Sequence, residues 1–481
     1  MELIPTPQID LGAICHIVTL CVAGLVILVL DLFIKNKERI PQIALGAVVL
    51  AAMSSMNDFG PAVHAFNNTI ISDGFAAFFN IIICIGSALT ILISVSYVKQ
   101  EEINYSEYYA LILFATAGMM LMALASNLIT VFLGLELMSI SLYILAGFNR
   151  AKIESTESAL KYFLLGAFAT GFLLYGMALI YGATGSTNIH EIAVAIKKDT
   201  INSKTLLYMG AGLMVVGLGF KTASVPFHMW TPDVYEGAPT AITAFMSVGP
   251  KAAAFAAFFR VFHAGLSGIA DQWVCLIWVL AVLTMTVGNL TAIVQTNIKR
   301  MLAYSSISHA GYVLVGLVAA NDLGSTSVLY YMLAYAFMNI GAFTVVIVLG
   351  RKGEENLNLE DYSGLAVRHP LLAFTMAVFM FSLAGIPPLA GFFGKFYIFS
   401  AAIKAGYVGL AVIGLLNSVV AVYYYLRVTV LMYIKDPVRE FPPLYISPFA
   451  VAALVIAAVG TIHIGIFPSW ILEIAQSSSL F

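Results

Sequence analysis

Residues 219–240 read GFKTASVPFHMWTPDVYEGAPT, and residues 382–401 read SLAGIPPLAGFFGKFYIFSA. Each stretch covers the middle of an apolar segment longer than 30 residues and contains prolines and glycines close to one lysine. Proline lacks a backbone donor and breaks a helix, so each stretch predicts a discontinuous helix, with a break after Lys221 and another before Lys395. Unwound backbone at membrane depth is tolerated only where protein or water surrounds it. Both breaks are therefore expected inside a membrane-spanning bundle.

The composition indicates a protein that is mostly surrounded by lipid. Of 481 residues, 61% are hydrophobic and 10% are charged, against roughly 25% charged in a soluble domain. Soluble, disordered and fibrous classes are therefore excluded, and a net charge of −2 offers no basic face for nucleic acid. The cysteines lie singly in apolar runs without metal-ligand spacing, so neither a zinc nor an iron–sulfur site is predicted. They are Cys15, Cys21, Cys84 and Cys275.

Fourteen apolar segments are long enough to cross about 30 Å of hydrocarbon, which takes about 20 residues each. They predict an all-α polytopic membrane protein with about 14 transmembrane helices. The N-terminus lacks a basic stretch and a small-residue cleavage site, so we expect a retained first helix and a mature chain that begins at residue 1. The predicted limits are 11–34, 40–57, 74–97, 107–125, 127–148, 158–184, 205–235, 239–263, 273–296, 302–320, 325–349, 370–403, 406–433 and 446–467.

Basic residues in the connections predict the orientation. Thirteen lie in one alternating set of connections and four in the other. Because translocation of lysine and arginine is disfavoured, we place the richer set in the cytoplasm and both termini on the opposite side. The connection 185–204 is an exception, with three lysines on the translocated side. The richer set is Lys35, Lys37, Arg39, Lys99, Arg150, Lys152, Lys299, Arg300, Arg351, Lys352, Arg368, Lys435 and Arg439, and the other is Lys197, Lys198, Lys204 and Lys404.

Few charges remain inside the predicted spans. The basic ones are Lys161, Lys221, Lys251, Arg260, Lys395 and Arg427, and among the acids only Glu136 lies deep in a span. Lys161 and Arg260 lie near span ends, where we expect their side chains to extend to the interface. The other central charges need a partner, a wet cavity or a function, because charge in hydrocarbon is costly. These are Glu136, Lys221, Lys251 and Lys395.

The two broken spans also predict an internal repeat. They are the seventh and the twelfth, and since five is odd, units of five spans would be inverted relative to each other. Two inverted five-helix repeats (spans 4–8 and 9–13), each with a discontinuous helix and midplane charges, are typical of ion-translocating membrane proteins. The predicted division is 1–104 for an N-terminal three-helix segment, 105–265 and 266–435 for the two repeats, and 436–481 for the last helix.

The buried charges suggest proton movement. Desolvation disfavours the charged form of a lysine and a nearby carboxylate restores it, so a movable Glu136–Lys221 pair could switch the lysine between holding and releasing a proton. Lys251 and Lys395 would continue the line, with hydroxyl groups and ordered water between them. The candidate hydroxyl groups belong to Ser139, Ser141, Ser305 and Ser306.

Two histidines are possible relays. His309 lies about seven residues into the tenth span and can carry protons near neutral pH, and a purely hydrogen-bonded structural histidine is an equal alternative. His228 lies at irregular backbone near Lys221, which favours a relay slightly more. Neither a nucleotide-binding glycine motif nor a nucleophile elbow lies in a loop that could host it. The energy source is therefore expected to be an ion gradient or a partner.

Four motifs then carry a family resemblance. GLELMSISLYIL at 134–145, the stretch at 219–240, IKRMLAYSSISHAGY at 298–312 and GIPPLAGFFGKFYIF at 385–399 together resemble the antiporter-like subunits of proton-pumping NADH-quinone oxidoreductase (respiratory complex I) and the related Mrp-type antiporters. The resemblance covers essentially the whole chain. It implies proton-path roles for five residues and an accessory role for His228. The five are Glu136, Lys161, Lys221, Lys251 and Lys395.

Three details resemble subunit N within that family. Ser247 stands where subunits L and M have a histidine, and SVGPKAAAF places Lys251 slightly earlier than their eighth-helix lysine. Lys395 stands where subunit M has glutamate. The chain ends at Phe481, soon after the fourteenth span, without the long lateral helix of subunit L.

The resemblance implies a translocase subunit without redox chemistry of its own. Quinone reduction in other subunits would drive proton transfer through the buried Glu/Lys row. FMN, iron–sulfur clusters and quinone are expected on those subunits, and no cofactor or metal in this chain. The expected partners are subunit M, the lateral helix of subunit L, small membrane subunits and the lipid bilayer, and no nucleic acid. The expected location is a bacterial inner membrane, with both termini periplasmic.

The leading hypothesis, a proton-translocating subunit of a quinone-reducing complex, has two alternatives: an Mrp-type Na+/H+ antiporter subunit and a structural spacer without a proton path. Purification separates the leading hypothesis from the antiporter. We expect the tagged chain to co-purify with a complex that shows flavin and iron–sulfur absorbance. A colourless assembly with salt-dependent proton flux would support the antiporter instead. The spacer predicts that Lys221→Ala leaves proton pumping intact.

Overall fold

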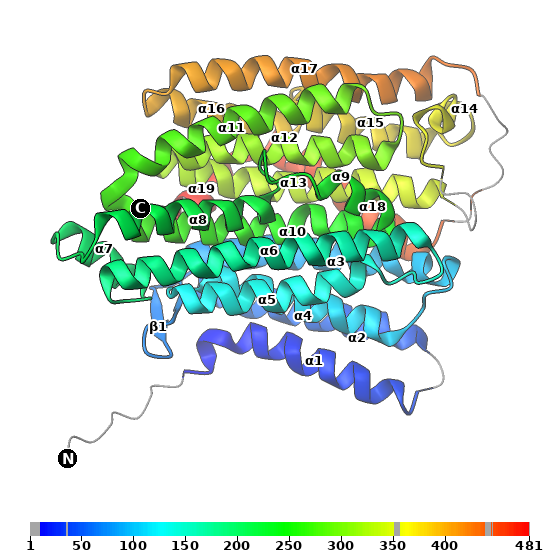
Figure 1. Ribbon diagram of the computed structural model, residues 1–481. Coiled ribbons are helices and arrows are strands. Elements are labelled where there is room, and N and C mark those ends of the chain that lie inside the picture. The colour runs from blue at the N-terminus through cyan, green and yellow to red at the C-terminus, as the bar shows by residue number, and fades with distance from the viewer. Residues whose placement is uncertain (1–9, 35–36, 351–355, 438–443, 445, 481) are drawn as a thin grey trace.

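The computed structural model describes residues 10–34, 37–350, 356–437, 444 and 446–480. This part of the chain forms long helices lying side by side and one small antiparallel sheet (Figure 1), in which β1 (Val63–Ala65) pairs with β2 (Ile70–Ser72). The helices are α1 (Cys15–Asp31), α2 (Ile40–Ser55), α3 (Gly74–Gln100), α4 (Ser106–Leu124), α5 (Leu128–Ala146), α6 (Ile153–Thr184), α7 (Ile189–Lys197), α8 (Lys204–Thr222), α9 (Thr231–Gly237), α10 (Thr240–Phe259), α11 (Ala270–Ile293), α12 (Ile298–Ala319), α13 (Asp322–Leu349), α14 (Leu365–Arg368), α15 (Pro370–Ala384), α16 (Ala390–Lys404), α17 (Val408–Tyr433), α18 (Pro448–Ile466) and α19 (Pro468–Ser477).

Within the described residues, 13 helical stretches are long and apolar enough to cross a membrane. They correspond to all but one of the fourteen predicted spans. The exception is the segment 370–403, which is divided into α15 and α16 of 15 residues each, so neither half reaches the length of a full span. The all-α membrane fold is confirmed, and the count differs by one because of a predicted break.

Both predicted helix breaks are present. α8 ends at Thr222 and is followed by Ala223 in the left-handed conformation (φ +60°), and α15 ends at Ala384 and is followed by Gly385 (φ +88°). A left-handed residue is a common way to end a helix. In Figure 1 the pair α8 and α9 runs from left to right, whereas α15 and α16 run from right to left. The two broken helices are thus antiparallel.

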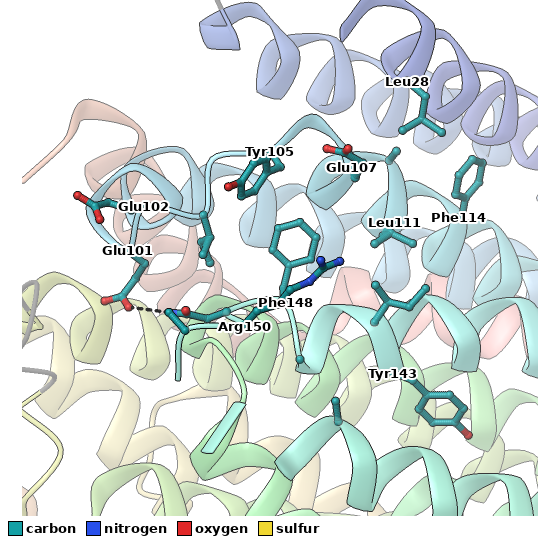
Figure 2. A pocket seen from close by; sticks show the side chains of 17 residues that line it. Leu28, Glu101, Glu102, Tyr105, Glu107, Leu111, Phe114, Tyr143, Phe148 and Arg150 are labelled. Atoms are coloured by element: carbon teal, nitrogen blue, oxygen red, sulfur yellow. Dashed lines mark hydrogen bonds between the residues drawn. The ribbon is translucent and has the colours of Figure 1, made fainter. Parts of the chain in front are cut away.

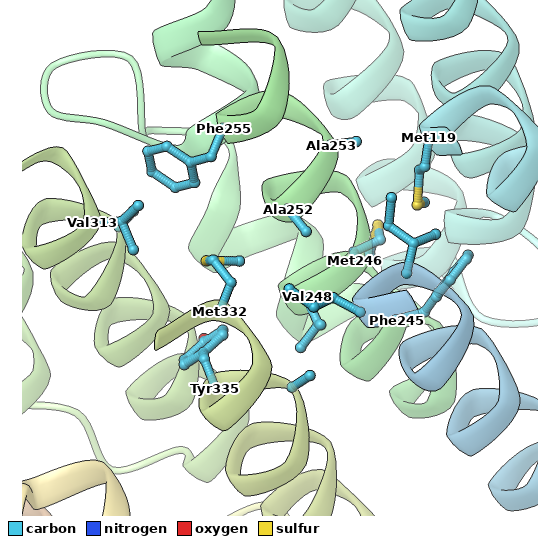
Figure 3. Close-up of a cluster of buried hydrophobic side chains, with 14 of the residues drawn as sticks. Met119, Phe245, Met246, Val248, Ala252, Ala253, Phe255, Val313, Met332 and Tyr335 are labelled. Carbon is cyan, nitrogen blue, oxygen red and sulfur yellow. The ribbon is translucent and has the colours of Figure 1, made fainter. Parts of the chain in front are cut away.

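α10 forms the centre of the core. All its residues from Thr240 to Phe259 are buried, because α3, α4, α8 and α13 surround it. Figure 3 shows Phe255 of α10 near Val313 and Met332, which belong to α12 and α13. Lys251 lies in the second half of this helix, so its ammonium group is placed in the most enclosed part of the described bundle.

The connection 185–204 is partly helical. It contains α7, whose residues Ile189, Ile192 and Ile196 are buried on one face. In Figure 1, α7, the β1–β2 hairpin, the beginning of α1 and α19 lie at the same end of the bundle. This end is the one that we predict to be translocated, and its lysines lie on or beside a short amphipathic helix.

Two of the predictions about basic residues are wrong. Arg260 does not extend to the interface: its side chain is buried and donates to the Asp73 carboxylate (3.0 and 2.6 Å) and to the Ala123 carbonyl (2.7 Å). The planar guanidinium satisfies its donors on these oxygens inside the protein. Lys299 lies with Arg300 in the first turn of α12, but unlike Arg300 its side chain is buried, and its Nζ donates to the carbonyls of Glu236 and Ala238 near the end of α9.

Four other basic residues used for the orientation lie outside the described residues. They are Lys35, Arg351, Lys352 and Arg439.

The Arg260–Asp73 pair predicts a stability effect. Arg260→Ala leaves the Asp73 carboxylate, which also caps α3 through the Ala76 amide (2.9 Å), without its cation. Breaking a buried ion pair costs about 3–5 kcal/mol, so we expect a clearly lower unfolding temperature of the purified protein in detergent.

The matched control is Lys99→Ala, which removes the exposed pair between Lys99 and Glu38. Exposed pairs contribute about 0–1 kcal/mol, so this variant should unfold close to the wild-type temperature. Equal unfolding temperatures for the two variants would contradict the structural role of Arg260.

Candidate functional site

Lys221 lies in the last turn of α8, against α5. Its Nζ donates to the Ser139 hydroxyl (2.7 Å) and the Tyr143 hydroxyl (3.2 Å). The rings of Tyr143, Tyr162 and Phe220 lie 5.2 to 5.6 Å from the same nitrogen. The C-terminal end of a helix carries partial negative charge, so the break stabilises the cation from one side and the aromatic faces stabilise it from others.

Glu136 lies on α5, three residues before Ser139 and seven before Tyr143, a spacing that puts all three side chains on one helix face. The described residues contain no ion pair within 4.0 Å between Glu136 and Lys221. Instead, Lys221 is bonded to the two hydroxyl groups on the same helix, and Glu136 acts on it electrostatically. Ser139 and Tyr143 therefore hold the ammonium group beside the face of α5 that carries Glu136.

Lys251 follows Pro250 in α10 and contacts α12. Its Nζ donates to the Ser306 carbonyl (2.7 Å) and the Ser306 hydroxyl (2.6 Å). A small cavity of about 10 Å³ is lined by Lys251, Ser306, His309 and Tyr331, which is about the space of one water molecule by this measure. The cavity connects Lys251 and His309. On α12, His309 lies about one turn after Ser306, the hydrogen-bond partner of Lys251.

His309 is buried and hydrogen-bonded through both ring nitrogens. Nδ1 contacts the Tyr331 hydroxyl (2.5 Å), and Nε2 contacts the Tyr425 hydroxyl (3.0 Å), which also bonds to the Ser305 hydroxyl. A neutral imidazole donates through one nitrogen and accepts through the other. The two predicted interpretations of His309 are thus compatible: the ring is fully hydrogen-bonded, and its partners are groups that can exchange protons.

Lys395 reaches back from α16 to the end of α15. Its Nζ donates to the carbonyls of Leu383 (3.0 Å) and Ala384 (2.9 Å) and to the Ser418 hydroxyl (2.9 Å), and it lies 5.0 Å from the Tyr312 ring centre. The two carbonyls are among those that a helix end leaves without intrahelical partners. Both ammonium groups thus lie near a helix break, but Lys221 belongs to the first half of its broken helix and Lys395 to the second half of its own.

Lys161 belongs to a separate charged cluster at one end of the bundle. It pairs with Asp233 of α9, which also accepts from Arg300 (2.9 Å), and Arg300 pairs with Glu236 (2.6 Å). These side chains are 28 to 42% exposed. Lys161 is thus ion-paired at an accessible surface and is not hydrogen-bonded into the Lys221 site.

The remaining candidates, His228 and Ser141, form no hydrogen bond to the buried lysines among the described residues. His228 is half-buried between α8 and α9, and its Nδ1 has no hydrogen-bond partner among the described residues. Ser141 donates to the Leu137 carbonyl of its own helix (2.9 Å). The sequence analysis missed Tyr143, Tyr331 and Tyr425. Only the spacing of Tyr143 from Glu136 could have indicated one of them, because the other two meet His309 through tertiary packing.

These residues fall within one recognised family. The family described as "NADH:quinone oxidoreductase/Mrp antiporter, TM" matches residues 125–421, a range that includes all three buried-lysine sites. The chain therefore belongs to this family of antiporter-like membrane subunits.

Relatives that match over nearly their whole length show which type of subunit within the family this chain resembles. The chain is 53% identical over 472 residues to NADH-quinone oxidoreductase subunit N of Trichlorobacter lovleyi, covering 98% of this chain and 97% of the relative. It is 46% identical over 467 residues to subunit N 1 of Solibacter usitatus, covering 96% of each. Within the family, the chain belongs with subunit N of NADH-quinone oxidoreductase, an antiporter-like integral membrane subunit of that complex.

Solved structures agree with this assignment. A chain of respiratory complex I from Thermus thermophilus with bound aureothin matches with a TM-score of 0.81 and 36% identity, covering 95% of this chain and 98% of that one. A chain of the Mrp complex from Dietzia sp. matches with a TM-score of 0.85 at 21% identity, covering 98% and 97%, which shows a shared fold. Across the described part of the chain, no group of three or more His, Cys, Asp or Glu side chains could hold a metal ion.

Proposed function

We propose that this chain moves protons across the membrane through the buried row Glu136, Lys221, Lys251 and Lys395. One observation carries the proposal: the three lysines are 2 to 4% exposed, and among the described residues the hydrogen-bond partners of each Nζ are hydroxyl or carbonyl oxygens. Such oxygens accept hydrogen bonds from an ammonium group and from a neutral amine alike. A lysine in this setting can lose its proton without leaving a buried carboxylate unpaired.

The tyrosine and serine hydroxyl groups supply the short links of the path. Ser139 and Tyr143 connect the face of α5 that carries Glu136 to Lys221. Ser306 connects Lys251 to the turn of α12 that carries His309. His309 lies within electrostatic range of both Lys251 and Lys395. Because like charges repel strongly in a medium of low dielectric constant, protonation at one position disfavours protonation at the next. This electrostatic coupling would transmit a change of protonation from one residue of the row to the next.

Lys161 and His228 have accessory roles in this proposal. The ion pair between Lys161 and Asp233 would change as the charge at the Lys221 site changes. Asp233 lies on α9, which follows the break after α8, so the broken helix connects the two sites. His228 would take a proton at the break through its unpartnered Nδ1. Family similarity supports both assignments.

The energy would come from quinone reduction in other subunits, which would also hold FMN and the iron–sulfur clusters. Subunit M, the lateral helix of subunit L and small membrane subunits would be the neighbours. We place the protein in a bacterial inner membrane with both termini periplasmic. Removing the buried Lys299 from the count changes the asymmetry of basic residues only from thirteen against four to twelve against four.

We also propose the division into a segment 1–104, repeats at 105–265 and 266–435, and a C-terminal part 436–481. The two antiparallel broken helices, each with a buried lysine near its break, support it. The first repeat then contains Lys221 and Lys251, and the second contains Lys395.

Lys221→Ala tests the path. We expect quinone-coupled proton pumping and NADH oxidation in membrane vesicles to fall by about tenfold or more, because a positioned proton-transfer group commonly contributes 10²–10⁴ in rate. The complex should still assemble. Lys404→Ala, the same change at an exposed lysine of α16, is the control. Normal pumping in the Lys221 variant of an assembled complex would overturn the proposal.

Tyr425→Phe tests the relay at His309. The change removes the hydroxyl group that contacts Nε2 and keeps the ring, so we expect reduced pumping with normal assembly. Tyr397→Phe is the control, since the Tyr397 ring packs against Tyr330 and Phe393 and lies outside the His309 contacts. If Tyr425→Phe pumps like the wild type while Lys221→Ala does not, His309 has only a structural role.

A further inference from the structure

The sites of Lys221 and Lys395 differ in what lies beside them. Tyr143, a hydrogen-bond partner of Lys221, lines a cavity of about 940 Å³ at the end of the bundle (Figure 2). Tyr312 and Ser418, which contact Lys395, lie on α12 and α17, and α11 packs against both of these helices. The geometry of the Lys395 site therefore depends on how α11 holds α12 and α17 together.

Asn289 of α11 connects the three helices. Its side chain is fully buried. Its Nδ2 donates to the Tyr312 hydroxyl of α12 (3.2 Å) and to the Asn417 carbonyl of α17 (3.1 Å). Its Oδ1 accepts from the Tyr424 hydroxyl of α17 (2.9 Å). An amide offers two donor hydrogens and one acceptor oxygen, so this side chain uses both kinds of group to join α11 to its two neighbours.

Two glycines bring α11 and α12 close together at this level. A Cβ atom at Gly288, next to Asn289, would lie 2.6 Å from the Ser308 hydroxyl oxygen and 2.9 Å from the Ser308 amide nitrogen. A Cβ atom at Gly311, next to Tyr312, would lie 2.7 Å from a backbone nitrogen of α11. The two backbones are thus in close contact where Asn289 reaches Tyr312, and this contact fixes the amide opposite the phenol hydroxyl.

The two α17 residues that bond to Asn289 set the rotation of their helix. Asn417 and Tyr424 are about two turns apart, so they lie on one face of α17. Ser418 and Tyr425 follow them directly and lie together on the neighbouring face. Hydrogen bonds that fix the first face therefore also fix the direction of the Ser418 and Tyr425 hydroxyl groups.

These hydroxyl groups belong to the sites of Lys395 and His309. The Ser418 hydroxyl accepts from Lys395 Nζ (2.9 Å), and the Tyr425 hydroxyl contacts His309 Nε2 (3.0 Å). The partner of the amide on α12, Tyr312, places its ring centre 5.0 Å from the same lysine nitrogen. All three groups thus depend on one amide, which forms no hydrogen bond to either titratable residue within the described part of the chain.

We propose that Asn289 is a positioning residue for proton transfer between His309 and Lys395. This inference rests on the proposed function. An amide has no titratable proton near neutral pH, so Asn289 acts through the groups that it holds. It keeps the Ser418 and Tyr425 hydroxyl groups at hydrogen-bond distance from the lysine and the imidazole. A proton that moves between the two residues then meets donors and acceptors that are already aligned.

Asn289→Leu tests this role, because leucine has a similar size and no hydrogen-bonding group. We expect proton pumping by the assembled complex in membrane vesicles to fall by about tenfold, since a misplacement of about 1 Å can cost up to about 100-fold in rate. Asn80→Leu is the matched control. Asn80 is also fully buried, on α3, and its side chain contacts His16 (3.4 Å), so this variant should pump like the wild type.

Combined variants test whether Asn289 acts through the α17 hydroxyl groups. In a Ser418→Ala/Tyr425→Phe background both hydroxyl groups are absent, so adding Asn289→Leu should lower pumping by a clearly smaller factor than it does in the wild type. Independent effects would multiply instead. Equal fold-losses in the two backgrounds would mean that Asn289 acts elsewhere, and the positioning role would be rejected.

Asn289→Asp tests the hydrogen bonds themselves. Aspartate keeps the acceptor oxygen, and a buried carboxyl group without a cation partner retains its proton, which leaves one donor. We expect Asn289→Asp to pump several times faster than Asn289→Leu. Equal pumping by the two variants would show that the hydrogen bonds of residue 289 are irrelevant to the reaction and would overturn the proposal.

The remaining outcomes separate this role from the proposed function. Wild-type pumping in Asn289→Leu, together with impaired pumping in Lys221→Ala, rejects the positioning role only. Normal pumping in Lys221→Ala rejects the proposed function. If Asn289→Leu does not assemble, Tyr424→Phe, which removes the hydroxyl group that donates to Asn289 Oδ1, takes its place in the same comparisons.

Discussion

The cost of placing ammonium groups in hydrocarbon shapes this structure. A charged side chain at the centre of a bilayer costs about 2.5–3.5 kcal/mol or more, and Lys221, Lys251 and Lys395 are almost completely buried in the described bundle. Each is stabilised by oxygen atoms that the surrounding helices supply. The end of α15, Ser306 of α12 and the hydroxyl-bearing face of α5 place such oxygens next to a lysine Nζ.

At the helix breaks, backbone atoms help to stabilise the buried ammonium groups. A helix that ends within the bundle leaves carbonyl groups without intrahelical partners and presents the negative end of its dipole. Lys395 uses the carbonyls at the end of α15, and Lys221 lies at the end of α8. The same irregular backbone that would be unfavourable in lipid thus stabilises a cation, through direct hydrogen bonds at Lys395 and through the partial charge of the helix end at Lys221.

The sequence analysis predicted the spans, both breaks and the central lysines, because apolar length, proline and isolated charge are local signals. It was wrong about Arg260 and Lys299. Both lie near helix ends, where a long basic side chain can either reach the interface or turn inward, and their partners lie far away along the chain: Asp73 for Arg260, and the carbonyls of α9 for Lys299. It also missed the tyrosines, since an apolar segment rich in aromatic residues gives no sign of which hydroxyl groups meet a titratable group.

By itself, the sequence determined that this is a polytopic helical membrane protein with broken helices and buried charges, because the bilayer imposes a length and a polarity on each segment independently. Only the tertiary structure decided which oxygens hold each lysine, that Lys221 bonds to Ser139 and Tyr143 instead of forming an ion pair with Glu136, and that His309 bonds to two tyrosines. Those contacts join helices distant in sequence, and hydrogen bonds depend on separations of a few ångströms that side-chain packing sets.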